Sequence, residues 1–202
     1  MSGVLQALLG GGGVSGSTWD PANKGSNITL SSQNTIANGN GTVATVAGTK
    51  SIATSTSKYY FTVTVVGTPS SLGSGGGIGT GVGTNSTYVG SQSSTYGFNV
   101  QGSFWTIQGN GGALSSPVAP PAVGDVLNVA VDASGASISV YLGINGNYYD
   151  STGAAAGTTP TTATFTGLAT GQLPFGSAKG ASENVTINTT PGSIPAGYVA
   201  LG

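Results

Sequence analysis

Residues 124–150 read GDVLNVAVDASGASISVYLGINGNYYD, and their alternation decides the fold class. Apolar side chains occupy every second position of two segments: Leu127, Val129, Val131, Ile138, Val140 and Leu142. A period of two is typical of a β-strand with one buried face. Turn-forming residues separate the two segments at 132–137, and Asn-Gly at 145–146 favours a second tight turn. The stretch therefore predicts a β-hairpin with a second turn after it.

Three of the five acidic residues of the chain also lie here: Asp125, Asp132 and Asp150. Each is at a strand edge or in a turn, where a carboxylate accepts backbone N–H bonds. A calcium loop instead needs several oxygen ligands at short spacing, which neither DASGAS nor DPANKG provides. Asp150 and Glu183 could in principle converge as a glycosidase pair, but no local motif supports that. We interpret the three aspartates as structural.

The remainder of the chain repeats the same pattern of short strands between turns. Strands are predicted at 26–31, 42–47, 58–67, 75–83, 94–100, 103–109, 162–168, 184–190 and 197–202. In 58–67, Tyr59, Phe61, Val63 and Val65 lie on one face and threonines on the other. No amphipathic helix is evident from residue 18 onward, so the pattern indicates an all-β sandwich or barrel. Glycine at alternate positions of 75–83 favours close packing of a neighbour.

The composition excludes several classes of function. Only 4% of residues are charged, the net charge is −1, and arginine is absent, which removes the basic surface that nucleic acid requires. The chain has no cysteine and no histidine, so it lacks thiolate metal ligands and the commonest general base. We therefore expect a protein that is not an enzyme and that binds no metal or cofactor.

Residues 1–17 are predicted to be a glycine-rich arm, followed by one domain at 18–202. The arm carries Val4, Leu5, Leu8 and Leu9, whose i, i+4 spacing suits a short helical segment before the glycines at 10–13. No apolar run approaches the ~20 residues of a membrane span, so no membrane insertion is expected. A basic segment typical of signal peptides is also missing, so we expect synthesis in a cytoplasm without export by that route.

Two glycine motifs are weak signals for nucleotide binding. Gly11, Gly13 and Gly16 satisfy G-x-G-x-x-G, but a dinucleotide site needs a strand before the motif and a helix after it. GIGTGVG at 77–83 lacks the Lys-Ser/Thr of a phosphate loop. We interpret both segments as structural.

The order of several motifs resembles SPRY-type domains, above all those of structural and fibre proteins of tailed bacteriophages. The motifs are TWDPANKGSNITLS, VATVAGTKSIATSTSKYYFTVTV, GIGTGVG, STYGF, GDVLNVAVDASGASISVYLGING and ENVTINTTPGSIPAGYVALG, which together extend over residues 18–202. The chain departs from the family at Thr62, where a glutamate is usual, at NTTPGS (188–193), and in the poorly alignable region 151–182. The resemblance implies two packed antiparallel sheets of concanavalin-like, jelly-roll type, used for binding and not for catalysis.

The first functional hypothesis is a virion protein of a tailed bacteriophage, either a tail fibre or a capsid-attached fibre or decoration protein. It would be assembled in the host cytoplasm, be present in several copies or as a homo-oligomer, and be exposed on the particle. Val4, Leu5, Leu8 and Leu9 would dock the arm onto other virion proteins. Packing of the same four side chains onto the chain's own sandwich is the alternative.

The second hypothesis is a glycan-binding module for host surface polysaccharide, and it is compatible with the first. Sugar sites combine aromatic faces with a few polar groups. The candidate residues are Tyr88, Tyr96, Trp105, Asn145, Tyr148 and Tyr149. Packing in the core or on a sheet is the alternative for each aromatic side chain. A glycan hydrolase is the least favoured reading, because the chain has a single glutamate, few aspartates and no histidine.

Overall fold

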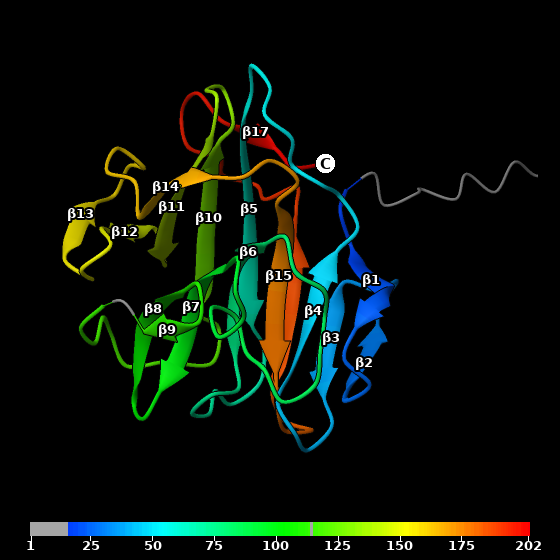
Figure 1. Ribbon diagram of the computed structural model, residues 1–202. Helices are drawn as coiled ribbons and strands as arrows, with labels where there is room; N and C mark the ends of the chain where they lie inside the picture. Colours follow the sequence, from blue (N-terminus) through cyan, green and yellow to red (C-terminus); the bar gives the residue numbers. More distant parts are fainter. Residues whose placement is uncertain (1–15, 114) are drawn as a thin grey trace, which may run out of the picture.

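The computed structural model describes residues 16–113 and 115–202, which form two stacked sheets with 17 strands (Figure 1). Its first sheet has seven strands in the order β1 (Trp19–Lys24), β4 (Ala44–Gly48), β15 (Leu173–Ala178), β6 (Gly75–Gly79), β7 (Thr95–Gln101), β8 (Phe104–Gly109) and β9 (Gly112–Ala113). Every neighbouring pair in this sheet is antiparallel.

The second sheet has ten strands. Eight of them follow the order β13 (Ala155–Gly157), β12 (Asn147–Tyr149), β11 (Ile138–Ile144), β10 (Val126–Asp132), β5 (Lys58–Val65), β16 (Asn184–Asn188), β3 (Ile36–Gly39) and β2 (Ile28–Ser31). β14 (Phe165–Leu168) pairs with β11, and β17 (Val199–Ala200) pairs with the start of β5 in the parallel direction. The predicted all-β sandwich of two antiparallel sheets is confirmed.

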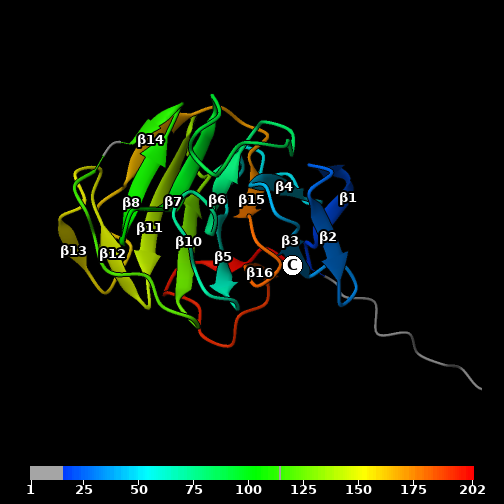
Figure 2. The ribbon, with the colours of Figure 1, turned by 90° about the horizontal axis from the view of Figure 1, so that it is seen from below.

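Strand alternation places the core between the two sheets. Phe61, Val63 and Val65 of β5 lie in the same buried cluster as the alternating apolar residues of β10 and β11. Phe98 of β7 and Trp105 of β8 enter this cluster from the seven-stranded sheet. Figure 2 shows the two layers from below, with the last residues of the chain, in red, crossing the outer side of the ten-stranded sheet.

The hairpin expected from residues 124–150 is confirmed. β10 and β11 pair along all but the first residue of each strand, from Leu127 opposite Ile144 to Asp132 opposite Ser139. Asn145 and Gly146 then connect β11 to β12 with φ angles of 52° and 83°. Positive φ at both central residues is the geometry of a two-residue type I′ turn, which Asn-Gly favours.

Several strands were missed or misplaced by sequence reasoning. β1, β3, β9, β12 and β13 were not predicted, and neither was β15, which lies between β4 and β6 in the seven-stranded sheet. Its sequence, LPFGSA, contains a proline and a glycine, which are usually depleted in strands. The predicted strand 75–83 is shorter than expected, because β6 ends at Gly79.

The predicted arm lies almost wholly outside the described residues, including Val4, Leu5, Leu8 and Leu9. Ser17, the last residue assigned to the arm, is buried, and its hydroxyl accepts a hydrogen bond from the Lys50 backbone N–H at 3.1 Å. Within residues 16–113 and 115–202, no helix has the length and apolar character needed to cross a membrane.

Candidate functional site

The outer face of the ten-stranded sheet carries a second, smaller cluster of aromatic side chains. Tyr60 of β5, Ala130 of β10 and Tyr148 of β12 are buried together there. They are outward-facing because they alternate with the core residues of the same strands. Ile194 and Tyr198, from the loop that joins β16 to β17, pack against this cluster. The C-terminal loop therefore covers part of the sheet and creates a concave surface.

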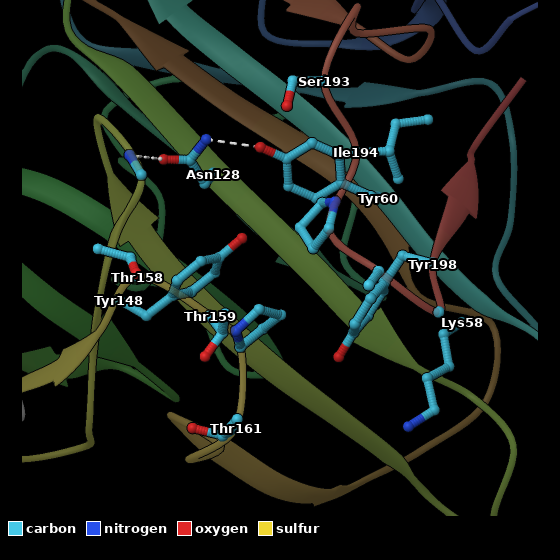
Figure 3. A pocket seen from close by; sticks show the side chains of 15 residues that line it. Lys58, Tyr60, Asn128, Tyr148, Thr158, Thr159, Thr161, Ser193, Ile194 and Tyr198 are labelled. Atoms are coloured by element: carbon cyan, nitrogen blue, oxygen red, sulfur yellow. Dashed lines mark hydrogen bonds between the residues drawn. The ribbon is translucent and has the colours of Figure 1, made fainter.

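A cavity of about 530 Å³ opens at this place. This volume lies within the range of about 300–1,000 Å³ that is typical of small-molecule sites. The cavity lies between the C-terminal loop and the loop that joins β13 to β14, with the strands β5, β10 and β12 beneath it (Figure 3). Its lining consists of Lys58, Tyr60, Asn128, Gly146, Tyr148, Thr158, Thr159, Pro160, Thr161, Ser193, Ile194, Pro195, Ala196, Gly197 and Tyr198.

Hydrogen bonds fix the polar groups at one end of this pocket. The Gly146 N–H donates to Asn128 Oδ1 at 2.8 Å, and Asn128 Nδ2 donates to the Tyr60 hydroxyl at 2.7 Å (Figure 3). Because a backbone N–H can only donate, the atom of the Asn128 amide that faces Gly146 must be the oxygen, and the NH₂ group must face Tyr60. The Tyr60 oxygen therefore accepts from Asn128, and its own O–H proton is available to another acceptor. Tyr60 and Asn128 are each 5% exposed, so these groups are held in place by packing.

Asp125 supports this end of the pocket from below. Its Oδ1 accepts a hydrogen bond from Asn145 Nδ2 at 2.9 Å, and Asn145 Oδ1 accepts one from the Val126 N–H at 2.9 Å. Its Oδ2 accepts from the indole N–H of Trp105 and from the Ala122 N–H, both at 2.8 Å. Trp105 belongs to the seven-stranded sheet, so Asp125 joins the two sheets and fixes the turn that carries Gly146.

A charged pair lies at the other end of the pocket. Lys58 Nζ is 2.8 Å from Asp132 Oδ2 and 5.8 Å from the ring centroid of Tyr198. The hydrogen bond to Asp132 raises the pKa of Lys58 and outweighs the lowering effect of burial. Burial acts to raise the pKa of Asp132, but the hydrogen bonds from Lys58 and Ser134 outweigh it and lower that pKa. Both groups are therefore charged at neutral pH.

The tyrosines of the pocket stay protonated at neutral pH. Burial raises the pKa of Tyr60, and it raises the pKa values of Tyr148 and Tyr198 further with the help of neighbouring phenols and, for Tyr198, of Asp132. Their hydroxyl groups can therefore both donate and accept hydrogen bonds. Neutral hydroxyls, an amide and aromatic faces are the groups that recognise polyhydroxylated ligands.

The structure brings together few of the glycan-binding candidates predicted from sequence. Tyr148 lines the pocket, and Asn145 lies in the turn beside it, next to the lining residue Gly146. Tyr149 is directed to the opposite side of the sheet, where its ring contacts Phe98 edge-on with the centroids 6.1 Å apart.

The three other aromatic candidates also lie away from the pocket. Tyr96 packs against Phe165, with ring centroids 4.9 Å apart. Trp105 is 0% exposed and donates its indole N–H to Asp125. Its ring is therefore part of the core and offers no face to a ligand. Tyr88 is half-buried in the loop between β6 and β7 and does not belong to the lining.

Asp132 and Asp150 accept hydrogen bonds from the backbone of their turns, as expected. Asp132 accepts the Ser134 N–H at 3.0 Å, and Asp150 accepts the Thr152 and Ala154 N–H groups at 2.8 and 3.0 Å. Glu183, which was considered as a partner of Asp150, is buried and accepts the Lys179 N–H at 3.1 Å. These partners belong to separate loops, and neither acid is among the lining residues of the pocket. Across residues 16–113 and 115–202, no three acidic side chains gather as a metal site would require.

Tyr60, Asn128, Lys58 and Tyr198 were not identified from sequence as site residues. A signal for two of them was present, since Tyr60 and Asn128 occupy the outward positions of strongly alternating strands. A large aromatic and an amide at such positions indicate that something covers that face. Tyr198 gave no comparable signal, because its place depends on how the last loop returns to β5.

Comparison with known proteins identifies the fold. No protein-family model matches the chain, and no curated protein matches it. The SPRY domain of human HERC1 superposes with a TM-score of 0.59 at 13% identity, covering 84% of this chain and 96% of that one. A human SPRY domain gives 0.58 at 11% identity (80% and 94%), and the TRIM65 PSpry domain gives 0.54 at 16% (86% and 92%). The chain therefore has the SPRY-like sandwich fold that its motifs predicted.

Proposed function

We propose that this SPRY-like sandwich is a non-enzymatic attachment module that binds a host-surface glycan in the tyrosine-lined pocket. The observation that carries the proposal is the chemistry of the pocket. Three tyrosines, one asparagine and several hydroxyl side chains converge there on a cavity of about 530 Å³. The half-buried ring of Tyr198 can pack on the apolar face of a sugar, whereas Tyr60 and Tyr148 are 5% and 2% exposed and contribute mainly their hydroxyl groups. Amides and hydroxyls bind sugar hydroxyl groups. A stand-alone lectin-like module is the alternative context for the same site.

Binding is favoured over catalysis by the groups that the pocket lacks. Among the described residues that line it, no carboxylate is present, whereas glycoside hydrolysis depends on a pair of them. Histidine is absent from the whole chain, so no imidazole can act as a general base. The pocket can hold a hydroxylated ligand but offers no evident acid–base pair to cleave it.

The setting we propose for this module is the surface of a tailed bacteriophage, as a tail fibre or a capsid-attached fibre or decoration protein. The support is the order of sequence motifs, which resembles that of phage structural and fibre proteins. The apolar side chains of the arm, Val4, Leu5, Leu8 and Leu9, would dock the module to other virion proteins. Many copies on one particle would raise the avidity of a weak single site.

A glycan array of bacterial capsular and lipopolysaccharide sugars tests the proposal. We expect the wild-type protein to bind at least one glycan, and Tyr198→Ala to weaken that binding about tenfold or more, because one wall of the pocket is removed. Tyr88→Ala is the matched control, since Tyr88 is also a half-buried tyrosine but lies outside the lining. Thermal melts of both variants establish that they are folded.

Two outcomes count against the proposal. Absence of binding to every glycan on the array removes its basis. Equal binding by wild type and by a folded Tyr198→Ala variant places any glycan site elsewhere on the molecule.

A further inference from the structure

We infer that the glycan bound by this pocket is acidic, with the carboxylate of a uronic or similar sugar acid contacting Lys58. The inference rests on the proposed function and specifies the chemical class of its ligand. It follows from the charge distribution around the cavity, from the geometry of the Lys58–Asp132 pair, and from the polarity of the neighbouring hydroxyl groups.

The described lining residues carry positive charge at one position and no negative charge. Lys58 contributes a positive charge, and the described lining residues include no aspartate or glutamate. Lys58 is also one of only four cationic side chains in the chain. Its position is therefore the place on the cavity wall where an anion is attracted.

The ion pair with Asp132 leaves Lys58 able to bind a second anion. An ammonium group has three N–H bonds, and the contact with Asp132 Oδ2 at 2.8 Å occupies one of them. Asp132 itself does not line the cavity, and its Oδ1 accepts hydrogen bonds from the N–H and hydroxyl of Ser134. A ligand carboxylate in contact with Nζ is closer to the ammonium than to Asp132, so attraction exceeds repulsion.

The neighbouring groups complete an anion-binding end. Lys58 lies beside the ring of Tyr198, at the end of the pocket away from Asn128 and Ser193 (Figure 3). The Tyr198 phenol stays neutral, because burial raises its pKa, and it can donate to a carboxylate oxygen. The opposite end presents the Asn128 amide, the Tyr60 hydroxyl and Ser193, which suit neutral sugar hydroxyls.

A purely structural role for Lys58 makes a different prediction. Lys58 and Asp132 are directly opposite each other on β5 and β10, and such cross-strand pairs commonly add a little stability and nothing else. In that case, replacing Lys58 changes stability slightly and leaves any preference between neutral and acidic ligands unchanged. Ligand selectivity therefore separates the two roles.

The test is an NMR titration with matched monosaccharides, D-glucose against D-glucuronate and D-galactose against D-galacturonate, at constant ionic strength. We expect at least one acid to shift pocket resonances and to bind about fivefold or more tightly than its neutral partner. Lys58→Met should bring the ratio of acid to neutral-sugar affinity to about one, and added NaCl should weaken the acid more than the neutral sugar. Lys24→Met is the control, because Lys24 bonds the Ile28 carbonyl and lies outside the lining.

Three results overturn the inference. The first is equal affinity for the acid and the neutral sugar in both pairs, and the second is an acid preference that survives in Lys58→Met. Either result overturns the inference and leaves the proposed function intact. Failure of all four sugars to perturb the pocket also contradicts it. The glycan array decides in that last case whether the proposed function fails as well.

Discussion

Asp125 has a role at the residue scale that its sequence context did not reveal. It was expected to be a strand-edge residue, yet it is buried and accepts hydrogen bonds from Trp105, Ala122 and Asn145. A buried indole N–H needs an acceptor, and none is evident in the sequence near Trp105. The local residue types are readable from sequence, but their partners across the sandwich are not.

We expect Asp125→Ala to lower the free energy of unfolding by about 2–4 kcal/mol, because a buried indole N–H and an amide lose their shared acceptor. Urea unfolding followed by tryptophan fluorescence measures this change. Asp150→Ala is the control, since Asp150 accepts its hydrogen bonds from its own turn and should cost clearly less stability than Asp125→Ala. Equal effects of the two substitutions would show that the inter-sheet contact contributes nothing.

The tyrosines on the outer face give the protein a pH dependence on the alkaline side. Burial raises the pKa values of Tyr60 and Tyr148 above the value of about 10 that an unfolded chain has. Up to about pH 10 these tyrosines are protonated in both the folded and the unfolded state, so they contribute no pH dependence to stability. Above it the unfolded state loses its protons first, so stability falls by about 1.4 kcal/mol per pH unit for each such group.

Denaturant unfolding between about pH 8 and about pH 11, with phenolate absorbance recorded in parallel, tests this expectation. Stability should be flat at the lower end and fall above about pH 10. Replacing Tyr148 with phenylalanine should make the decline shallower. Stability that is unchanged to about pH 11 would contradict the burial of these phenols.

At the scale of elements, alternation made the strands with regular patterns predictable. β5, β10 and β11 were located from period two alone, and the Asn-Gly turn after β11 has the expected geometry. β15 was missed because LPFGSA contains few strand-favouring residues, and its place between β4 and β6 is decided by long-range pairing. The pocket was only partly predictable because two of its walls are loops, after β13 and β16, whose positions depend on long-range contacts.

The glycines of β6 allow the neighbouring strand to approach closely, although the strand itself is shorter than predicted. A Cβ atom at Gly77 would lie 2.0 Å from the Tyr96 carbonyl oxygen and 2.5 Å from Gly97 Cα, both on the paired strand β7. These are backbone atoms in the interior of the sheet, so they cannot move aside easily. The expected close packing of a neighbour against this strand is confirmed.

We therefore expect Gly77→Ala to destabilise the protein by about 2 kcal/mol or more, as measured by thermal and urea unfolding. Gly192→Ala is the matched control, because a Cβ there meets nothing within 4 Å and should change stability by less than about 0.5 kcal/mol. A Gly77→Ala protein as stable as wild type would mean that β6 and β7 are farther apart than described.

At the scale of the whole molecule, the fold follows from the motif order, while the biological setting is a proposal. The SPRY-like sandwich was predicted from motifs spread over residues 18–202, and solved SPRY domains share it at 11–16% identity. That level of similarity establishes architecture and carries no ligand with it. Function has to be argued from the pocket, whose residues come from β5, β10, β12, the Asn-Gly turn and two loops.

Deletion of residues 1–13 tests the proposed docking role of the arm, which lies outside the described residues. We expect the truncated protein to fold, with an unchanged melting temperature, and to be absent from phage particles assembled in its presence. Removing Val4, Leu5, Leu8 and Leu9 takes away the apolar contacts that would hold it there. Incorporation of the truncated protein at the level of the full chain would refute the docking role.

The central claim is that the tyrosine-lined pocket on the outer face of the ten-stranded sheet binds glycan. An amide NMR titration with the tightest-binding oligosaccharide from the array tests it most directly. We expect the shifted resonances to cluster at Gly146, at 158–161 and at 193–198, with the Trp105 indole N–H unaffected. Shifts confined to the opposite sheet, or none at saturating oligosaccharide, would contradict it.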